Sequence, residues 1–163
     1  MTFLIEAANY ISVLGDLWLL LPLSFILILF LFYKKKKMQA LLVVFGFMVG
    51  SLLNFLWKEI FQIPRPENPL IQISGYSFPS GHAVQSLLFF SILFFVFKDQ
   101  ITNKYKKYSF ILTNAAIILL VGWSRVYLRT HYWSDVIAGY AFAIIWLVFV
   151  LWLVKRKVFQ KIF

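Results

Sequence analysis

A short polar stretch, residues 124–135, lies between two apolar runs that could each enter a membrane. It contains Arg125, Arg129, His131 and Asp135. Charged side chains at the edge of a membrane core are costly unless they are paired or used. Because His131 and Asp135 are four positions apart, they would share one face of a helix. The carboxylate could then hold one imidazole nitrogen, fix the tautomer and leave the other nitrogen free to react.

Apolar runs of this kind dominate the chain. The 163 residues are 62% hydrophobic and only 13% charged, whereas soluble domains are about 25% charged. The sequence therefore predicts an all-α integral membrane protein, a single domain over residues 1–163, with about five transmembrane helices. The candidate spans are 17–32, 38–57, 83–97, 109–123 and 136–154. Residues 1–16 carry a polar side chain every three or four positions, which favours an amphipathic helix in the membrane interface over a frayed terminus.

The basic residues predict the orientation. The net charge is +10, but twelve of the sixteen Lys and Arg residues form clusters after the first, third and fifth spans. Such clusters are topology determinants, so we expect them in the cytoplasm and expect no nucleic-acid partner. The clusters are Lys34–Lys37, then Lys98, Lys104, Lys106 and Lys107, then Lys155, Arg156, Lys157 and Lys161. The N-terminal helix, the loop 58–82 and the stretch 124–135 then share the outer face, which in a bacterium would be the periplasmic or external face of the inner membrane.

Two further patterns constrain the bundle. Gly46 and Gly50 have the small-xxx-small spacing of a close helix contact, which we assign to packing within the monomer rather than to a dimer. Residues 58–82 contain four prolines and are expected to be a loop with short helical turns at most. The chain has no cysteine, which excludes disulfides, a thiol nucleophile and a thiolate metal site.

The outer segments hold the groups expected to bind phosphate. Lys58 and Arg65 precede Pro79-Ser80-Gly81-His82, and both histidines of the chain lie on this side. Guanidinium forks and an ammonium match phosphate oxygens, and the helix start near Ser80 adds backbone N–H donors. Two imidazoles on opposite sides of a phosphoryl group suit in-line displacement, one as nucleophile and one as proton donor.

Taken together, three motifs resemble the signature of the type 2 phosphatidic acid phosphatase superfamily. They are Lys58-x6-Arg65-Pro66, Pro79-Ser80-Gly81-His82 and Ser124-Arg125-x5-His131-x3-Asp135, without a substitution at a signature position. The resemblance implies the helical bundle shared with vanadium-dependent haloperoxidases, and a lipid phosphatase that needs no metal or other cofactor. His131 then matches the nucleophile that forms a phosphohistidine, Asp135 the carboxylate that orients it, and His82 the general acid. The phosphate-binding shell is matched by Lys58, Arg65, Ser80, Gly81 and Arg125.

These motifs do not identify the lipid substrate. We expect an envelope lipid with a terminal phosphate or diphosphate, with lipid A 1-phosphate first and undecaprenyl diphosphate or phosphatidylglycerol phosphate as alternatives. Transfer of the phosphoryl group to a second lipid, or a scaffold that binds anions without turnover, are further alternatives. Taken singly, Lys58 and Arg65 fit interface cations, the Pro-Ser-Gly turn fits a helix cap, and His131 with Asp135 fits a structural pair. Arg129 lies outside the signature and fits a solvated interface arginine. Besides the substrate and the bilayer no partner is indicated, and the oligomeric state is not determined.

Overall fold

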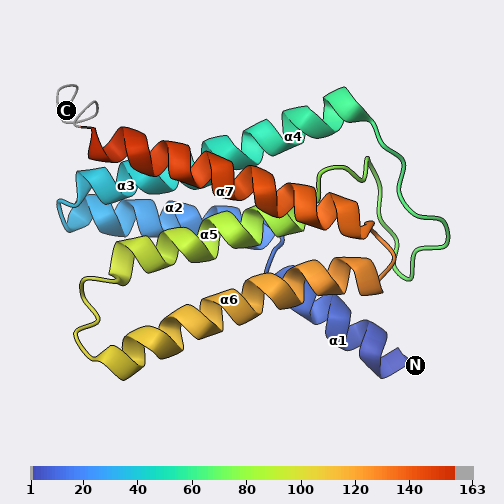
Figure 1. The fold of residues 1–163 in the computed structure, drawn as a ribbon, viewed down its shortest axis with the longest axis horizontal. Helices are drawn as coiled ribbons and strands as arrows, with labels where there is room; N and C mark the ends of the chain where they lie inside the picture. Colours follow the sequence, from blue (N-terminus) through green and yellow to red (C-terminus); the bar gives the residue numbers. More distant parts are fainter. Residues whose placement is uncertain (1, 157–163) are drawn as a thin grey trace.

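The computed structural model describes residues 2–156, and within that range every regular element is a helix (Figure 1). The all-α prediction is therefore confirmed. The elements are α1 (Thr2–Val13), α2 (Leu17–Tyr33), α3 (Lys37–Val43), the π-helical segment η1 (Val44–Val49), α4 (Gly50–Phe61), α5 (Gly81–Phe97), α6 (Lys104–Tyr127) and α7 (Trp133–Lys155). The segments α3, η1 and α4 follow one another without a break, so they form one long helical stretch.

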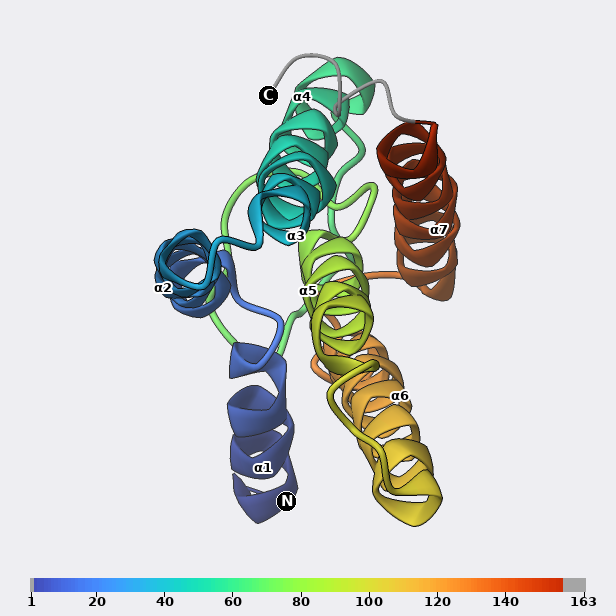
Figure 2. The same cartoon turned by 90° about the vertical axis from the view of Figure 1, so that its left-hand side faces the viewer.

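The helices are long and apolar enough for several membrane crossings. Four stretches meet this requirement by length and composition: Thr2–Tyr33, Lys37–Phe61, Lys104–Tyr127 and Trp133–Lys155. The helix α5 is apolar but shorter. It lies in the middle of the bundle and packs against α2, α4, α6 and α7 (Figure 2). Its buried residues Val84, Leu88, Ile92 and Val96 recur every four positions and form one side of the main apolar core.

The two small residues in the second stretch are used inside the monomer. A Cβ added at Gly46 would come within 2.7 Å of the Ile92 side chain, and one at Gly50 within 2.7 Å of Leu88 and Trp146. The prediction of an intramolecular contact is thus confirmed. The Trp146 indole donates to the carbonyls of Phe45 and Gly46, at 3.0 and 3.2 Å. A π-helical turn leaves such carbonyls differently placed from those of a regular helix, and here α7 uses them.

The N-terminal helix leads into the bundle. Helix α1 packs along α6, and the turn Leu14–Asp16 joins it to α2 (Figures 1 and 2). Its polar stripe is only partly exposed, because Ser12 is buried and its hydroxyl donates to the Asn9 carbonyl at 2.8 Å. The helix was predicted from this stripe, and its position in the membrane interface stays a prediction.

Several predicted boundaries are wrong in a way that affects the site. The non-helical segment runs from 62 to 80, so Lys58 lies on the last turn of α4, and Gly81 and His82 open α5. Helix α4 continues until Gln62 turns to φ +48°, two residues before Pro64. The fourth span begins at Lys104 rather than 109 because Asn103 caps it, its side chain accepting from the N–H groups of Tyr105 and Lys106.

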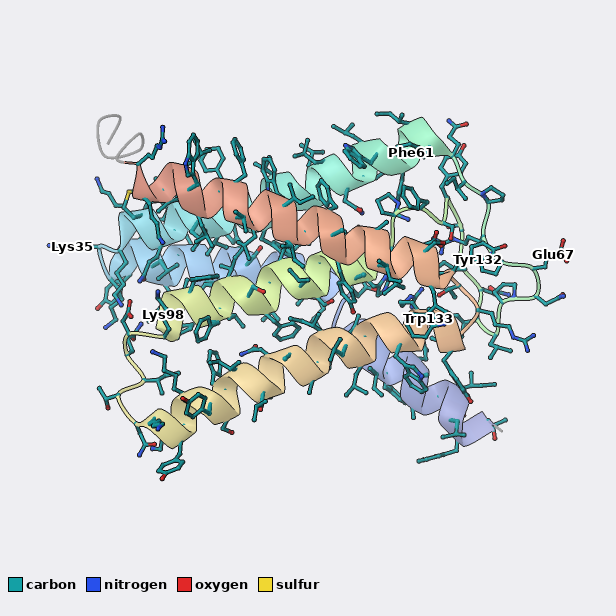
Figure 3. All side chains as sticks on the ribbon, in the orientation of Figure 1. Lys35, Phe61, Glu67, Lys98, Tyr132 and Trp133 are labelled. Carbon is teal, nitrogen blue, oxygen red and sulfur yellow. The ribbon has the colours of Figure 1, made fainter. Side chains whose placement is uncertain are left out.

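The two ends of the bundle differ in charge and shape. Lys35 and Lys98 lie at one end, and Glu67, Tyr132 and Trp133 lie at the other (Figure 3). The expected grouping of lysines opposite the long loop is therefore seen for Lys35 of the first cluster and Lys98 of the second (Figure 3). In the third cluster, Lys157 and Lys161 lie outside the described residues.

Candidate active site

The turn between α6 and α7 is fixed by the end of α6. The Arg125 carbonyl accepts from the Thr130 N–H at 3.0 Å, the Thr130 hydroxyl at 2.9 Å and the His131 N–H at 3.3 Å. Arg129 takes the left-handed φ of +54°, which reverses the chain there, and its side chain is exposed. His131 is consequently held against the helix end with only 3% of its surface exposed.

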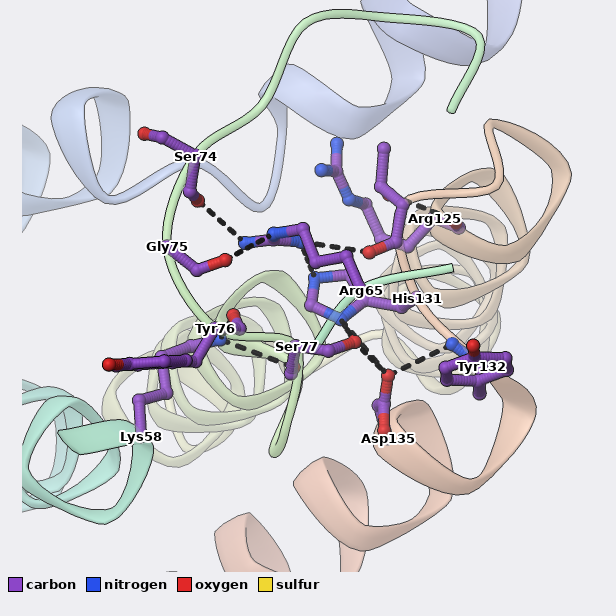
Figure 4. A network of polar contacts seen from close by, with 11 residues as sticks. Lys58, Arg65, Ser74, Gly75, Tyr76, Ser77, Arg125, His131, Tyr132 and Asp135 are labelled. Carbon is purple, nitrogen blue, oxygen red and sulfur yellow. Dashed lines mark hydrogen bonds and ion pairs between the residues drawn. The ribbon is translucent and has the colours of Figure 1, made fainter. Parts of the chain in front are cut away.

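Asp135 is fixed by the start of α7. It is the third residue of that helix, and its Oδ2 accepts from the Tyr132 N–H at 2.9 Å, which caps the helix. The same oxygen lies 3.4 Å from Nδ1 of His131 (Figure 4). The two residues were expected to share a helix face. Instead His131 precedes the helix, and the cap turns the carboxylate back toward the imidazole.

Ser77 is a third member of this group, and the sequence reasoning missed it. Its hydroxyl donates to Oδ2 of Asp135 and lies 3.3 Å from Nδ1 of His131. The residue is fully buried, and its backbone N–H donates to the Ile63 carbonyl at 2.8 Å. Its position just before Pro79-Ser80-Gly81-His82 was the available signal, but a serine in a proline-rich loop is also an ordinary turn residue.

Arg65 lies against the other nitrogen of the imidazole. Its Nη1 is 3.2 Å from Nε2 of His131 and donates to the Thr130 carbonyl at 2.8 Å. Its Nε and Nη2 donate to the carbonyls of Gly75 and Ser74, at 2.9 and 3.1 Å (Figure 4). A guanidinium can only donate, so Nε2 must be the unprotonated nitrogen and Nδ1 carries the hydrogen. The nitrogen that carries the lone pair thus faces the Arg65 guanidinium, the nearest of the cations predicted to bind phosphate.

The protonation state of His131 follows from its surroundings. Burial lowers the pKa of its imidazole from 6.5 to about 4, against the hydrogen bond to Asp135 and together with the charges of Arg65, Lys58 and Arg125. Burial also lowers the pKa of the Arg65 guanidinium, and the charge of Asp135 opposes that shift. At neutral pH His131 is therefore neutral, which is the form that can act as a nucleophile.

The remaining phosphate-shell candidates surround the same point. The Lys58 ammonium donates to the carbonyls of Tyr76 and Ser77, at 2.8 and 3.2 Å. The Ser80 N–H donates to the Asp135 carbonyl at 3.0 Å, which ties the start of α5 to α7. Gly81 lies beside Lys58, whose Cε would be 3.7 Å from a Cβ added there.

Two of the phosphate-shell candidates, Arg125 and Ser80, have buried polar atoms without a hydrogen-bond partner in the described residues. Arg125 is 1% exposed, and neither its Nε nor its Nη2 has a hydrogen-bond partner within residues 2–156. The Ser80 hydroxyl is in the same condition. The charge of Asp16 acts on Arg125, but buried donors without hydrogen bonds are costly, and the oxygens of a phosphate group would supply acceptors for them.

The second histidine opens α5. His82 Nε2 lies 3.9 Å from Oδ2 of Asp16, a residue of the α1–α2 turn that the sequence reasoning placed only on a polar stripe. His82 also interacts electrostatically with Arg125, His131 and Lys58, which places both histidines in one cluster. The site therefore collects groups from α4, the loop 62–80, α5, α6 and α7. The roles that the motifs assign to these groups stay predictions. Within residues 2–156 no three His, Asp or Glu side chains form a metal-binding group, and metal independence stays a prediction.

Comparisons with known proteins identify the family of the chain. The PAP2 superfamily matches residues 39–159. The chain is 34% identical over 143 residues to phosphatidylglycerophosphatase B of Bacillus subtilis (strain 168), across 86% of this chain and 70% of that protein. It is 32% identical over 130 residues to dolichyldiphosphatase 1 of Homo sapiens, across 71% of this chain but only 54% of that protein.

Two solved structures share the fold. The crystal structure of the first transmembrane PAP2 type phosphatidylglycerolphosphate phosphatase from Bacillus subtilis aligns with a TM-score of 0.84 and 31% identity, over 97% of this chain and 79% of that chain. LpxE of Aquifex aeolicus aligns with a TM-score of 0.69 and 24% identity, over 93% of this chain and 87% of that chain.

Fold and site together define a multi-pass membrane lipid phosphatase. The chain belongs to the PAP2 superfamily, and the resemblance drawn from the three motifs is confirmed.

Proposed function

We propose that this enzyme removes the terminal phosphate of a glycerophospholipid, with phosphatidylglycerol phosphate as its substrate, through a phosphohistidine on His131. The observation that carries the proposal is the orientation of this imidazole. Its Nδ1 faces Asp135 and Ser77, and its Nε2 faces the Arg65 guanidinium at 3.2 Å. A neutral imidazole held in this tautomer presents its lone pair to whatever anion the cations bind.

In the proposed reaction, Nε2 of His131 attacks phosphorus while the bond to the lipid oxygen breaks. Protonated His82 donates its proton to that oxygen, which leaves as an alcohol. In the second half, His82 takes a proton from water, the water oxygen attacks phosphorus, and the bond to His131 breaks. Arg65, Arg125 and Lys58 offset the charge on the phosphoryl oxygens throughout, and the donors at the start of α5 add to this.

An apolar surface next to the site could hold the hydrocarbon chain of a lipid substrate. An apolar groove lies between α2 and α5, bounded by Leu14, Leu20, Leu27, Phe90 and Phe97 among others. Its Leu14 end adjoins the turn that carries Asp16, and Asp16 faces His82. The groove supports a substrate whose phosphate lies in the site and whose hydrocarbon chain extends along the bundle.

The choice of lipid rests on the relatives. Phosphatidylglycerophosphatase B shares 34% identity with this chain, and the related crystal structure aligns over 97% of it. The alternative is a polyprenyl diphosphate, supported by 32% identity to dolichyldiphosphatase 1. The expectation of lipid A 1-phosphate is less directly supported, because the likeness to LpxE is at 24% identity and bears on the fold alone. It stays a prediction to be tested beside the others.

The proposed location is the inner membrane of a bacterium, with the site on the external or periplasmic side. Lys35 and Lys98 lie at the end of the bundle away from Tyr132 and Trp133 (Figure 3). Basic clusters favour the cytoplasmic side, so the site is expected to face outward.

The test is phosphate release by the purified protein in detergent micelles with excess EDTA. The panel holds phosphatidylglycerol phosphate, undecaprenyl diphosphate, lipid A and phosphatidic acid. Release from phosphatidylglycerol phosphate at the highest kcat/KM, abolished in His131→Ala, is the expected result. An acid-labile, base-stable phosphoryl group trapped on the wild-type protein, and absent from that variant, would identify the intermediate.

Other outcomes would redirect the proposal. Preference for undecaprenyl diphosphate or lipid A would replace the substrate and keep the mechanism. A transferase would remove phosphate from the lipid without releasing inorganic phosphate when an acceptor lipid is present. Release of inorganic phosphate would return when the acceptor is omitted. Tight phosphate binding without turnover of any lipid would show an anion-binding scaffold, and activity in His131→Ala would exclude His131 as the nucleophile.

A further inference from the structure

The turn between α1 and α2 brings a carboxylate to the second histidine. Oδ2 of Asp16 lies 3.9 Å from Nε2 of His82, and the side chains are 37% and 20% exposed. The other oxygen, Oδ1, accepts from the Trp18 N–H at 2.8 Å and caps α2. One carboxylate thus stabilises a helix start with one oxygen and faces the imidazole with the other.

The position of this turn is set by close backbone packing. A Cβ added at Gly15 would come within 2.9 Å of the His82 carbonyl and 2.5 Å of the Val121 side chain. Only a residue without a side chain brings the chain this near to α5 and α6. The approach of Asp16 to His82 is therefore a consequence of how α1 and α2 pack on the bundle.

His82 otherwise faces positive or neutral groups. The groups that act on it electrostatically from α4, the loop 62–80, α6 and the α6–α7 turn are Lys58, Arg65, Arg125 and His131. Burial and these cations disfavour a protonated imidazole, which is the form that a general acid needs before the reaction starts. The other nearby carboxylate, Asp135, lies beside His131, where it accepts hydrogen bonds from the Ser77 hydroxyl and the Tyr132 N–H.

We propose that Asp16 is a positioning residue that stabilises the His82 imidazolium for proton donation to the leaving lipid oxygen. This inference rests on the function proposed above. The separation of 3.9 Å is too long for a hydrogen bond, so the carboxylate acts through charge and leaves the Nε2 proton available. When the bond from phosphorus to the lipid oxygen breaks, that proton moves to the oxygen and His82 becomes neutral. Water returns the proton to His82 in the second step.

The inference gives the N-terminal segment a part in the reaction. Residue 16 lies before the part of the chain that matches the PAP2 superfamily, which begins at residue 39. The nucleophile is held by residues within that part, whereas the charge partner of the acid comes from the α1–α2 turn.

The test is Asp16→Asn with two substrates that differ in their leaving group. Asparagine is also a good N-cap and keeps the acceptor for the Trp18 N–H, so α2 should start as before. The leaving group of phosphatidylglycerol phosphate is an alkoxide, which needs a proton. The leaving group of p-nitrophenyl phosphate is a stable phenolate, which does not. Because general acid catalysis supplies about 10²- to 10⁴-fold and only part of it is removed, kcat/KM for the lipid should fall about tenfold. For the aryl ester it should change by less than about twofold.

The matched control is Glu6→Gln, which removes an exposed carboxylate of α1 by the same substitution. It should leave both rates near those of the wild type. An equal fall in kcat/KM for both substrates in Asp16→Asn would indicate a structural role and overturn the inference. An unchanged kcat/KM for the lipid would also overturn it. Failure of the wild-type protein to hydrolyse either substrate would instead refute the proposed function, and the two failures are thereby distinguished.

Discussion

Replacing Ser77 by alanine tests the arrangement that holds His131, the proposed nucleophile. Asp135 Oδ2 has three donors around it: the Ser77 hydroxyl, the Tyr132 N–H at 2.9 Å and His131 Nδ1 at 3.4 Å. The Ser77 hydroxyl also lies 3.3 Å from Nδ1, nearer than the carboxylate. The hydroxyl therefore links the Asp135 carboxylate to the imidazole. Without it, the tautomer and the ring orientation that the proposed reaction needs should be held less firmly.

The expected size of the effect follows from that one hydroxyl. A hydrogen bond to a charged group contributes about 1.5–3 kcal/mol. If this contribution is present in the transition state, its loss lowers kcat/KM by about 10- to 150-fold. The lower half of this range is expected, because Tyr132 still holds the carboxylate and the Asp135 side chain can move toward Nδ1. Ser77 is fully buried, so water cannot readily take the place of the hydroxyl.

The assay is release of inorganic phosphate from phosphatidylglycerol phosphate at several substrate concentrations. The matched control is Ser74→Ala in the same loop, because Ser74 contributes only its backbone carbonyl to Arg65 and its side chain is exposed. The control should stay within about twofold of the wild type, as is usual for surface substitutions. A loss of less than about threefold in Ser77→Ala would refute the link, since one charge-assisted hydrogen bond should cost more.

Three further outcomes are expected. In the pH profile of kcat/KM, corrected for ionisation of the substrate, the limb due to His131 should lie near pH 4, because burial lowers the pKa of its imidazole to about 4. The neutral form reacts, so activity should be lost as the pH falls through this value. A limb at about pH 6.5, the ordinary imidazole pKa, would contradict the assignment. Arg125→Lys should lower kcat/KM about 100-fold at unchanged elution on gel filtration, because an ammonium cannot place two donors where Nε and Nη2 lie; retention of activity would show that Arg125 does not bind phosphate. Single cysteines at Glu67 and Lys37 should react with an impermeant maleimide from opposite sides of intact cells, without background since the chain has no cysteine; labelling from one side would overturn the topology.

Much of the site could be predicted because its chemistry fixes residue types at fixed spacings. The motifs predict that His131 lies near Asp135, and that Lys58, Arg65 and Arg125 lie together as anion ligands, whatever the helix boundaries. Their convergence is seen, while their separate roles stay proposals. The boundaries were less predictable, because Lys58 and Arg125 are good helix formers and continue α4 and α6 beyond the apolar residues that marked the spans.

Ser77 and Asp16 could not be assigned from the sequence for a different reason. Ser77 acts through a loop whose path depends on long-range bonds, such as that from its own N–H to the Ile63 carbonyl. Asp16 could have been recognised as a helix cap, since it directly precedes an apolar run. Its nearness to His82 depends on how Gly15 packs against α5, which no local pattern records.

The two histidines therefore depend on different parts of the chain. The surroundings of His131 are built from α6, α7 and the loop 62–80, all within the segment that the superfamily matches. The carboxylate at His82 comes from the turn before α2, outside that segment. In the proposed mechanism, His131 meets the same phosphoryl group in every substrate, whereas His82 meets a leaving group that differs between a monoester and a diphosphate. If Asp16 acts as proposed, the N-terminal turn adjusts the enzyme to its leaving group while the three motifs keep the attack on phosphorus unchanged.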